Sequence, residues 1–386
     1  MTSTSGADGS GQLTIVGGSV LAGDDPAVGA ATVVCAGATI DHVGELGAVS
    51  GPTVDAGGAW VLPGIVDIHG DAFERSLMPR AGVPVDIDLA LLDNDRQLLA
   101  AGITTSFLSA TDSWEPGLRS RQTLRSLVVH IRNNRALPEV LLHVRHERCH
   151  VTDLDELMAW VLDGTVAMLS FNDHTAARPA DIGRLSATQV QRSGVGREQL
   201  QELMAQAVAQ SDLGSRQEVM LAEAARAAGC VTASHDASHE AHLIRDQELG
   251  VRIAEFPLSA ELARRYRDRG ISVVFGAPNL VRGGSHLGNL SVREALVAGV
   301  GDVLCSDYHY PSLLQAPFVL AESCGWKLGD AWATVAAAPA AVAGLDDRGR
   351  LEGGARADVI VVEPPDAGPA RVRAVVVGGR LAYQAA

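Results

Sequence analysis

Short apolar segments alternate with longer segments of helical character through the middle of the chain, and this alternation predicts the architecture. The apolar segments are rich in Val, Ile and Leu and end in polar residues, as buried parallel strands do. We predict strands at residues 64–71, 103–110, 139–147, 166–173, 231–236, 251–256, 272–278 and 301–307. We predict helices between them, at residues 87–101, 119–133, 197–228 and 260–269.

Eight strands joined mostly by helices indicate a (β/α)₈ TIM-like barrel, and an open doubly wound sheet is the alternative. Polar residues gather at the C-terminal ends of the predicted strands, where barrel enzymes carry their active sites, and this favours the barrel. Both chain ends are β-rich instead. We therefore predict an α/β protein in which residues 1–62 and 350–386 form a small β-sandwich domain and residues 63–349 form the barrel.

The predicted strand ends carry histidines and carboxylates. His69 and Asp71 follow the first strand and share a face, because side chains alternate along a strand. His143, Arg145 and Glu147 share a face of the third strand. The remaining strand-end groups are His174, His235 and Asp307. One strand-end histidine is more often structural than a ligand, and we interpret His143, His146 and His150 that way, but groups at five strand ends together indicate a metal site.

Three histidines and three carboxylates suit two divalent ions. A second ion needs a bridging group, and Lys327 is the one lysine in the chain and lies far from any strand end, so a carboxylated lysine is excluded. Glu147 is the candidate bridge. Asp307 is then free to accept the proton of a metal-bound water as general base.

The residues that carry this chemistry resemble the amidohydrolase superfamily, and more closely its α-D-ribose 1-methylphosphonate 5-triphosphate diphosphatases from carbon–phosphorus lyase pathways. The resemblance covers nearly the whole chain. It is carried by residues 62–71, 101–105, 172–175, 233–236, 253–257, 276–286, 306–308 and 312–314, of which the run Gly276–His286 is the most specific.

The resemblance implies a metal-dependent hydrolase that cleaves the triphosphate of this sugar, or of a related one, to the 5-phosphate and pyrophosphate by means of a metal-bound hydroxide. It implies two Zn²⁺, with Mn²⁺ or Fe²⁺ as alternatives. The implied metal ligands are His69, Asp71, Glu147, His174, His235 and Asp307, with Asp307 and Glu147 catalytic. Substrate contacts are expected from Asn279, Arg282, Gly283, Gly284, His286 and Arg145, which combine glycines that admit an anion with arginine donors.

Four departures from the family pattern bear on the substrate and on the strand count. The family commonly has other residues where this chain has Ala72, residues 176–180 and Ala237. Superfamily members usually carry the two lone histidines on the fifth and sixth strands, whereas this count gives the fourth and fifth, which suggests a miscounted strand. A C–N bond amidohydrolase (a cyclic amidase or deacetylase) on the same binuclear site is therefore the alternative function.

The composition and net charge indicate that the binding partners are small molecules. The net charge is −15, from 46 acidic and 31 basic residues, which argues against binding to nucleic acid or to an anionic membrane. The substrate is expected to be a phosphorylated small molecule, and homo-oligomerisation is left open. Five scattered cysteines and an N-terminus without a basic leader predict a cytoplasmic protein with free thiols.

Overall fold

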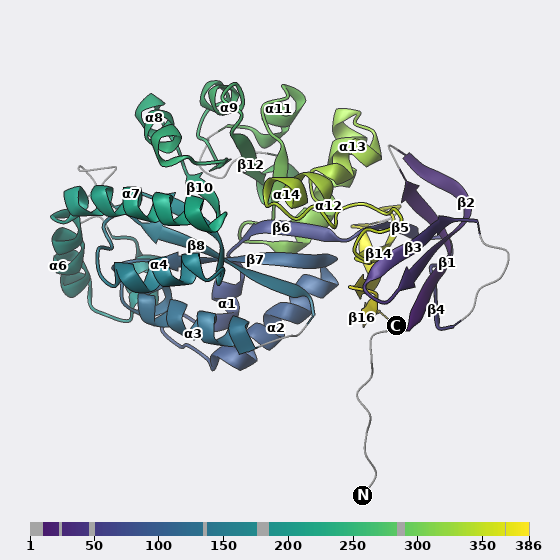
Figure 1. Ribbon diagram of the computed structural model, residues 1–386, viewed down its shortest axis with the longest axis horizontal. Helices are drawn as coiled ribbons and strands as arrows, with labels where there is room; N and C mark the ends of the chain where they lie inside the picture. Colours follow the sequence, from purple (N-terminus) through teal and green to yellow (C-terminus); the bar gives the residue numbers. More distant parts are fainter. Residues whose placement is uncertain are drawn as a thin grey trace, which may run out of the picture.

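The structure is a computed structural model that describes residues 11–22, 25–45, 51–133, 137–175, 185–283, 290–366 and 368–385. One of its two eight-stranded sheets is parallel, and the strands of this sheet neighbour each other in chain order. Helices surround this sheet (Figure 1). The eight strands are β6 (Ile65–Gly70), β7 (Ile103–Asp112), β8 (Glu139–Glu147), β9 (Val166–Asn172), β10 (Val231–His235), β11 (Ile253–Glu255), β12 (Ser272–Gly276) and β13 (Val303–Cys305).

The predicted barrel is confirmed, and so is the number of its strands. Each predicted strand overlaps one of the eight observed strands. His174 lies two residues beyond the fourth strand, β9, and His235 ends the fifth, β10. The suggestion of a miscounted strand is therefore wrong. In this chain the two histidines are carried by the fourth and fifth strands.

A single backbone bridge in the described residues closes the ring between its first and last strands. Gly70 pairs with Asp307, whose N–H donates to the carbonyl of His69 at 2.9 Å, while the N–H of Asp71 donates to the carbonyl of Asp307 at 2.9 Å. Glycine is required at position 70, since a Cβ there would lie 2.7 Å from Asp67 Oδ2. Closure thus places the polar ends of β6 and β13 side by side.

Helix α2 (Ile87–Ala100) shows how local sequence sets the helix bounds. The Asp86 side chain accepts hydrogen bonds from the N–H groups of Asp88 at 3.1 Å and Leu89 at 3.2 Å, which caps the first turn. The helix ends before Gly102, which adopts a φ of 77° that favours glycine. The chain then enters β7, whose ten residues are all buried.

The other helices pack outside the strands or over their ends. The helix predicted at residues 197–228 is interrupted at Ala209 and Gln210 and forms two helices. The remaining helices of the barrel are α1 (Phe73–Leu77), α3 (Arg121–Asn133), α4 (Leu154–Leu162), α5 (Ala187–Ser193), α6 (Arg197–Val208), α7 (Ser211–Ala228), α8 (Glu240–Leu249), α9 (Ala260–Arg267), α10 (Ala277–Val281), α11 (Val292–Val297), α12 (Tyr310–Cys324), α13 (Leu328–Ala333) and α14 (Ala337–Val342), with the 3₁₀ turn η1 (Gly117–Arg119).

Strands from both chain ends form a second sheet, seen in purple and yellow at one side of the barrel in Figure 1. Its two halves meet where β5 pairs antiparallel with β14. Its own core contains Ile15, Val33 and Val376. The domain boundaries at residues 62 and 350 stay predictions. The strands are β1 (Gln12–Ala22), β2 (Asp25–Ala36), β3 (Thr39–Gly44), β4 (Thr53–Asp55), β5 (Trp60–Pro63), β14 (Val359–Glu363), β15 (Arg371–Val377) and β16 (Arg380–Gln384).

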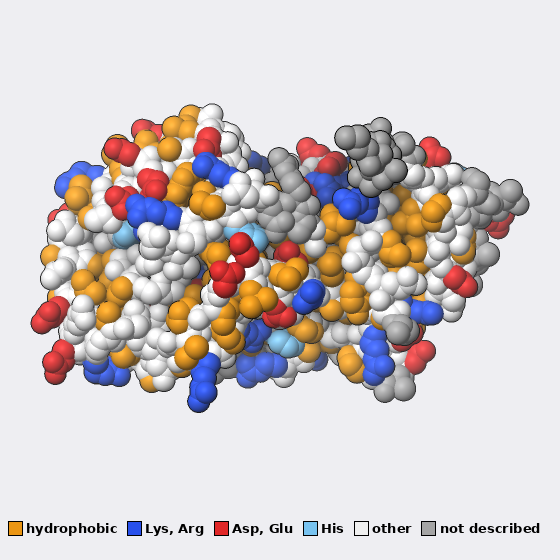
Figure 2. Space-filling view, turned by 90° about the horizontal axis from the view of Figure 1, so that it is seen from below, with side chains coloured by type: hydrophobic (Ala, Val, Ile, Leu, Met, Phe, Trp, Pro, Cys, Tyr) orange, Lys and Arg blue, Asp and Glu red, His pale blue; other side chains and the backbone are white. Residues whose placement is uncertain are grey.

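The surface carries both signs of charge. On the face shown in Figure 2, acidic and basic side chains are interspersed among hydrophobic ones. Within the described residues, no helix combines the length and the apolar character needed to cross a membrane.

Candidate active site

The end of β6 places His69 inside the barrel mouth against a carboxylate. His69 Nδ1 donates to Glu255 Oε1 at 2.7 Å, and both side chains are buried. Burial, together with the charge of Arg145, holds the pKa of His69 well below its usual value. The ring is therefore neutral, with its proton on Nδ1. Its Nε2 keeps a lone pair and has no hydrogen-bond partner among the described atoms.

Glu255, at the end of β11, was given no role by the sequence analysis. It is 1% exposed, and its Oε2 accepts a hydrogen bond from Ser170 Oγ at 3.2 Å. With His69 and His235 it forms a group whose ligand atoms lie within 4.8 Å of one another. The signal that could have found it was the strand-end rule itself, because a carboxylate ends the sixth strand as others end the first and third.

The ends of β8 and β9 bring Glu147 and His174 together. Glu147 Oε1 accepts from His174 Nδ1 at 2.5 Å, and its Oε2 accepts from the His174 N–H at 3.2 Å. Burial lowers the pKa of His174, but the Glu147 carboxylate outweighs it and raises the pKa to about 9. Burial raises the pKa of Glu147, but His174 and Arg145 outweigh it and lower the pKa to about 2.

A second group of potential ligands lies beside this pair. His174 Nε2 is 3.3 Å from His235 Nδ1, and Asp236 Oδ2 is 3.5 Å from the first atom and 3.2 Å from the second. Ligand atoms of a tetrahedral zinc ion are separated by about 3.3 Å, given metal–ligand distances of roughly 2.0–2.1 Å. These three atoms therefore fit one divalent ion. Asp236 was not predicted as a site residue.

Arg145 lies between predicted ligands. Its Nη1 donates to Asp71 Oδ2 at 3.3 Å, and its Nη2 donates to His235 Nε2 at 3.2 Å. It is 5% exposed. Asp71 thus meets an arginine, and it belongs to neither group of three close ligand atoms in the described residues.

Asp307 follows β13 and faces the same site. Its φ is 54°, a conformation that non-glycine residues seldom adopt and that is often found at functional sites. Burial, reinforced by Asp71, raises the pKa of its carboxyl to about 8. A cation brought into the site would lower that pKa and ionise the group.

Some of these side chains open into a cavity of about 220 Å³ at the barrel mouth. Asn279 and Arg145, both predicted to contact substrate, line it together with His235, Asp236 and Asp307. Arg282 is exposed at the end of α10 and Gly283 follows it, whereas the predicted residues Gly284 and His286 lie outside the described part of the chain. The rest of the lining is largely apolar: Phe256, Pro257, Leu258, Phe275, Gly276, Leu290, Val292 and Tyr308.

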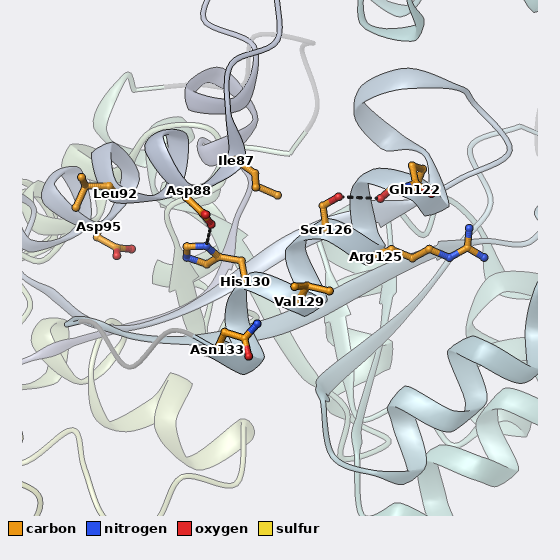
Figure 3. A pocket seen from close by; sticks show the side chains of 10 residues that line it. All are labelled: Ile87, Asp88, Leu92, Asp95, Gln122, Arg125, Ser126, Val129, His130 and Asn133. Atoms are coloured by element: carbon orange, nitrogen blue, oxygen red, sulfur yellow. Dashed lines mark hydrogen bonds and ion pairs between the residues drawn. The ribbon is translucent and has the colours of Figure 1, made fainter.

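A larger cavity of about 720 Å³ lies elsewhere, on the outer surface between α2 and α3. Figure 3 shows His130 and Asp88 pointing toward each other across it, and His130 Nδ1 is 2.6 Å from Asp88 Oδ1. It contains no strand-end residue, so we place the candidate active site at the smaller cavity.

We call the side chains at the mouth the inner cluster: His69, Asp71, Arg145, Glu147, His174, His235, Asp236, Glu255 and Asp307. An outer cluster of Asp112, Arg121, His146 and His150 lies behind β7 and β8. Arg121 donates to Asp112 through Nε at 2.6 Å and Nη2 at 2.7 Å, and His146 Nδ1 is 2.7 Å from the same carboxylate. The structure thus brings the six predicted ligands to one mouth, and their roles stay predictions.

Comparison with known proteins agrees with this architecture. The chain is 33% identical over 333 residues to the α-D-ribose 1-methylphosphonate 5-triphosphate diphosphatase of Escherichia coli (strain K12), which covers 81% of this chain and 85% of that protein. No family model matches.

Solved structures share the fold at low identity. The β-aspartyl dipeptidase of Fervidobacterium islandicum AW-1 superposes with a TM-score of 0.64 at 14% identity, covering 97% of each chain. An amidohydrolase from an environmental sample of the Sargasso Sea superposes with a TM-score of 0.64 at 15% identity, covering 97% of this chain and 93% of that one. The barrel fold agrees with the 33% identity over 81% of the chain, which shows that the chain belongs to the α-D-ribose 1-methylphosphonate 5-triphosphate diphosphatase family of the amidohydrolase superfamily.

Proposed function

We propose that this protein is a metal-dependent hydrolase that releases pyrophosphate from α-D-ribose 1-methylphosphonate 5-triphosphate, or from a closely related sugar triphosphate, and leaves the 5-phosphate. The observation that carries the proposal is the convergence of Arg145, His235 and Asp307 on one cavity in a chain that is 33% identical to such a diphosphatase. A guanidinium group binds a phosphoryl group through paired N–H donors.

Each residue of the site is assigned a separate role in this proposal. A divalent ion held by His174, His235 and Asp236 would polarise a phosphoryl oxygen and lower the pKa of water. We propose zinc, because zinc accepts both imidazole and carboxylate ligands in a tetrahedral arrangement. A bound cation would lower the pKa of the Asp307 carboxyl and ionise it. Asp307 would then accept the proton of the attacking water. Glu147 holds the His174 ring through Nδ1, as carboxylates commonly orient metal-binding histidines.

Hydrolysis of a C–N bond on the same ligands is the second candidate. The observation that favours it is the apolar wall of the cavity, which includes Phe256, Leu258 and Val292. Such a wall would accept the body of an acylated amine or a cyclic amide, and Arg145 would then bind a carboxylate of the substrate. Asp307 would serve as base in either reaction.

A direct test separates the two. The enzyme would be offered α-D-ribose 1-methylphosphonate 5-triphosphate, ATP, a cyclic amide and an N-acyl amino acid, with pyrophosphate and amine release followed in parallel. We expect pyrophosphate from the sugar triphosphate. In H₂¹⁸O, attack at the α-phosphorus places the label in the sugar 5-phosphate, which ³¹P NMR detects. Amine release without pyrophosphate release would overturn the proposal and favour the amidase.

A further inference from the structure

We propose that Arg145 occupies the position of a second metal ion, so that the centre holds one divalent ion, between His174 and His235. This inference rests on the metal site of the proposed function and replaces the pair of ions predicted from the sequence. The guanidinium supplies the second positive charge of the centre as part of the chain.

The hydrogen bonds of Arg145 use the ligand atoms that a second ion would need. Its Nη2 donates to His235 Nε2 at 3.2 Å, and arginine has no acceptor atom, so the lone pair on Nε2 accepts this bond. Its Nη1 donates to Asp71 Oδ2 at 3.3 Å. An ion on this side of the ring would have to displace the guanidinium from both groups.

The opposite nitrogen of His235 remains available. Its Nδ1 lies 3.3 Å from His174 Nε2 and 3.2 Å from Asp236 Oδ2, at separations that fit one tetrahedral ion. When Nε2 accepts a hydrogen bond from an arginine, Nδ1 is the ring nitrogen of His235 that can bind a metal. One imidazole thus serves one ion and one guanidinium, through its two nitrogens.

The other potential group, formed by His69, His235 and Glu255, is blocked by the same contact. It needs His235 as its third member, and a divalent ion there would lie close to the positive charge of Arg145. Glu255 instead holds the Nδ1 proton of His69 at 2.7 Å. The lone pair on His69 Nε2 is left to accept a hydrogen bond from water or from a substrate hydroxyl.

Arginine in this place has chemical consequences. Its charge is permanent and cannot be removed by a chelator. The side chain lines the active-site cavity, and each of its two Nη atoms carries two N–H groups. The guanidinium can therefore bind a phosphoryl oxygen beside the single ion.

The test is the metal content of the intact protein, measured by inductively coupled plasma mass spectrometry after equilibration with excess Zn²⁺ and gel filtration. The expected result is one tightly bound ion per chain in the wild type. Arg145→Met removes the charge while keeping an unbranched side chain, and it is expected to bind a second ion. Arg132→Met, at an exposed arginine paired with Asp163, is the matched control and should keep one ion.

Two tight ions in the wild type would overturn the proposal, and so would one ion in a folded Arg145→Met protein. Asp71→Asn tests the same point if Arg145→Met fails to fold. If Asp71 pairs with Arg145, this variant keeps one ion; if Asp71 is a ligand of the bound ion, it loses that ion, and the proposal fails.

The position of the ion is tested by two further variants. His174→Asn should abolish tight binding, while His69→Asn should retain one ion; the reverse pattern would place the ion at the other group and overturn the proposal. Substitution with Co²⁺ gives a second readout, because its visible absorption reports tetrahedral coordination. None of these measurements uses substrate, so a failure of the pyrophosphate-release assay is distinguishable from a failure here.

Discussion

The inner and outer clusters lie on opposite sides of strand β8 and are built from the same residue types, yet their charges are balanced differently. In the outer cluster, Asp112 is fully buried and is bonded to Arg121 and His146, which lower its pKa despite burial. In the inner cluster, Arg145 is the one described arginine bonded to a member, against five carboxylates. Burial raises the pKa of one of these, Asp307, to about 8.

A buried group of histidines and carboxylates is therefore not by itself a functional site. The outer cluster is internally neutralised, because Asp112 is bonded to Arg121 and His146, and it holds α3 against the barrel. Part of the inner cluster lines a cavity, and its five carboxylates face one arginine, so it can accept a cation from outside the chain. The inner cluster has fewer positive charges than carboxylates, and this deficit distinguishes it from the outer cluster.

The largest expected effect is on the inner cluster. Asp307→Asn should lower kcat by about 10²–10⁴-fold with a smaller change in KM, because proton transfer contributes in the transition state and not in ground-state binding. Steady-state kinetics of pyrophosphate release would measure this, with metal content checked in parallel. Asp163→Asn, at an exposed position, is the control. Near-normal kcat in Asp307→Asn would assign the base elsewhere.

In the outer cluster, Arg121→Met should affect stability and not metal binding. It leaves the Asp112 carboxylate buried without its arginine, which typically costs about 3–5 kcal/mol. Urea unfolding would measure the loss, with Arg125→Met, a more exposed arginine on the same helix, as control. A loss of bound metal at unchanged stability would show that the two clusters are not separate.

The same pair predicts a dependence of stability on pH. The pKa of Asp112 is lower in the folded state than in the unfolded chain, where it is about 3.9. The pair therefore stabilises the fold above pH ~4, and this contribution is lost as the pH falls below that value. Unfolding free energies measured from pH 7 to pH 3 should fall less steeply in Arg121→Met than in the wild type.

A smaller effect is expected for Glu147→Gln. If Glu147 orients His174 through Nδ1, as the 2.5 Å contact indicates, metal affinity should fall by about 10–100-fold with the number of ions unchanged. Competition against a chromophoric chelator would measure it, with Glu261→Gln, at an exposed position, as control. Loss of an ion would instead support Glu147 as the bridging ligand predicted from the sequence.

The smallest effect concerns the loop after α10. Arg282 is exposed, and an exposed ion pair contributes about 1 kcal/mol at most, so Arg282→Ala should raise KM for a triphosphate by no more than about fivefold. KM for an uncharged amide should not change. A much larger increase would show that Arg282 is enclosed when substrate is bound.

The barrel could be predicted from the sequence because the two signals that indicate it, apolar strands and polar strand ends, are local. Buried strands such as residues 272–276 are short apolar runs, and the rule that parallel strands end on one face brought His69, Glu147 and His235 to a common mouth. The sequence predicted two β-rich chain ends in one small domain, but not the pairing of β5 with β14. The register between two segments so distant in the chain is not encoded in either segment alone.

The sequence missed what depends on backbone conformation and long-range contact. Asp236 neighbours His235, and strand alternation points neighbours to opposite faces, but its φ of 56° turns the chain and brings its carboxylate to the same ligand group. Glu255 ends a strand that the sequence did predict, but its contact with His69 joins side chains 186 residues apart. The pairing of Arg145 with His235 joins side chains 90 residues apart.

The antiparallel pairing of β5 with β14 also sets an order for events on the ribosome. Pro63 pairs with Val359, so β5 emerges roughly 300 residues before its partner does. At synthesis rates of about 5–20 residues per second, this interval lasts roughly 15–60 s. The barrel, whose strands neighbour each other in chain order, is able to assemble during that interval. The edge of β5 that pairs with β14 stays unpaired until the last tenth of the chain is made, and it is open to pairing with other chains for that time.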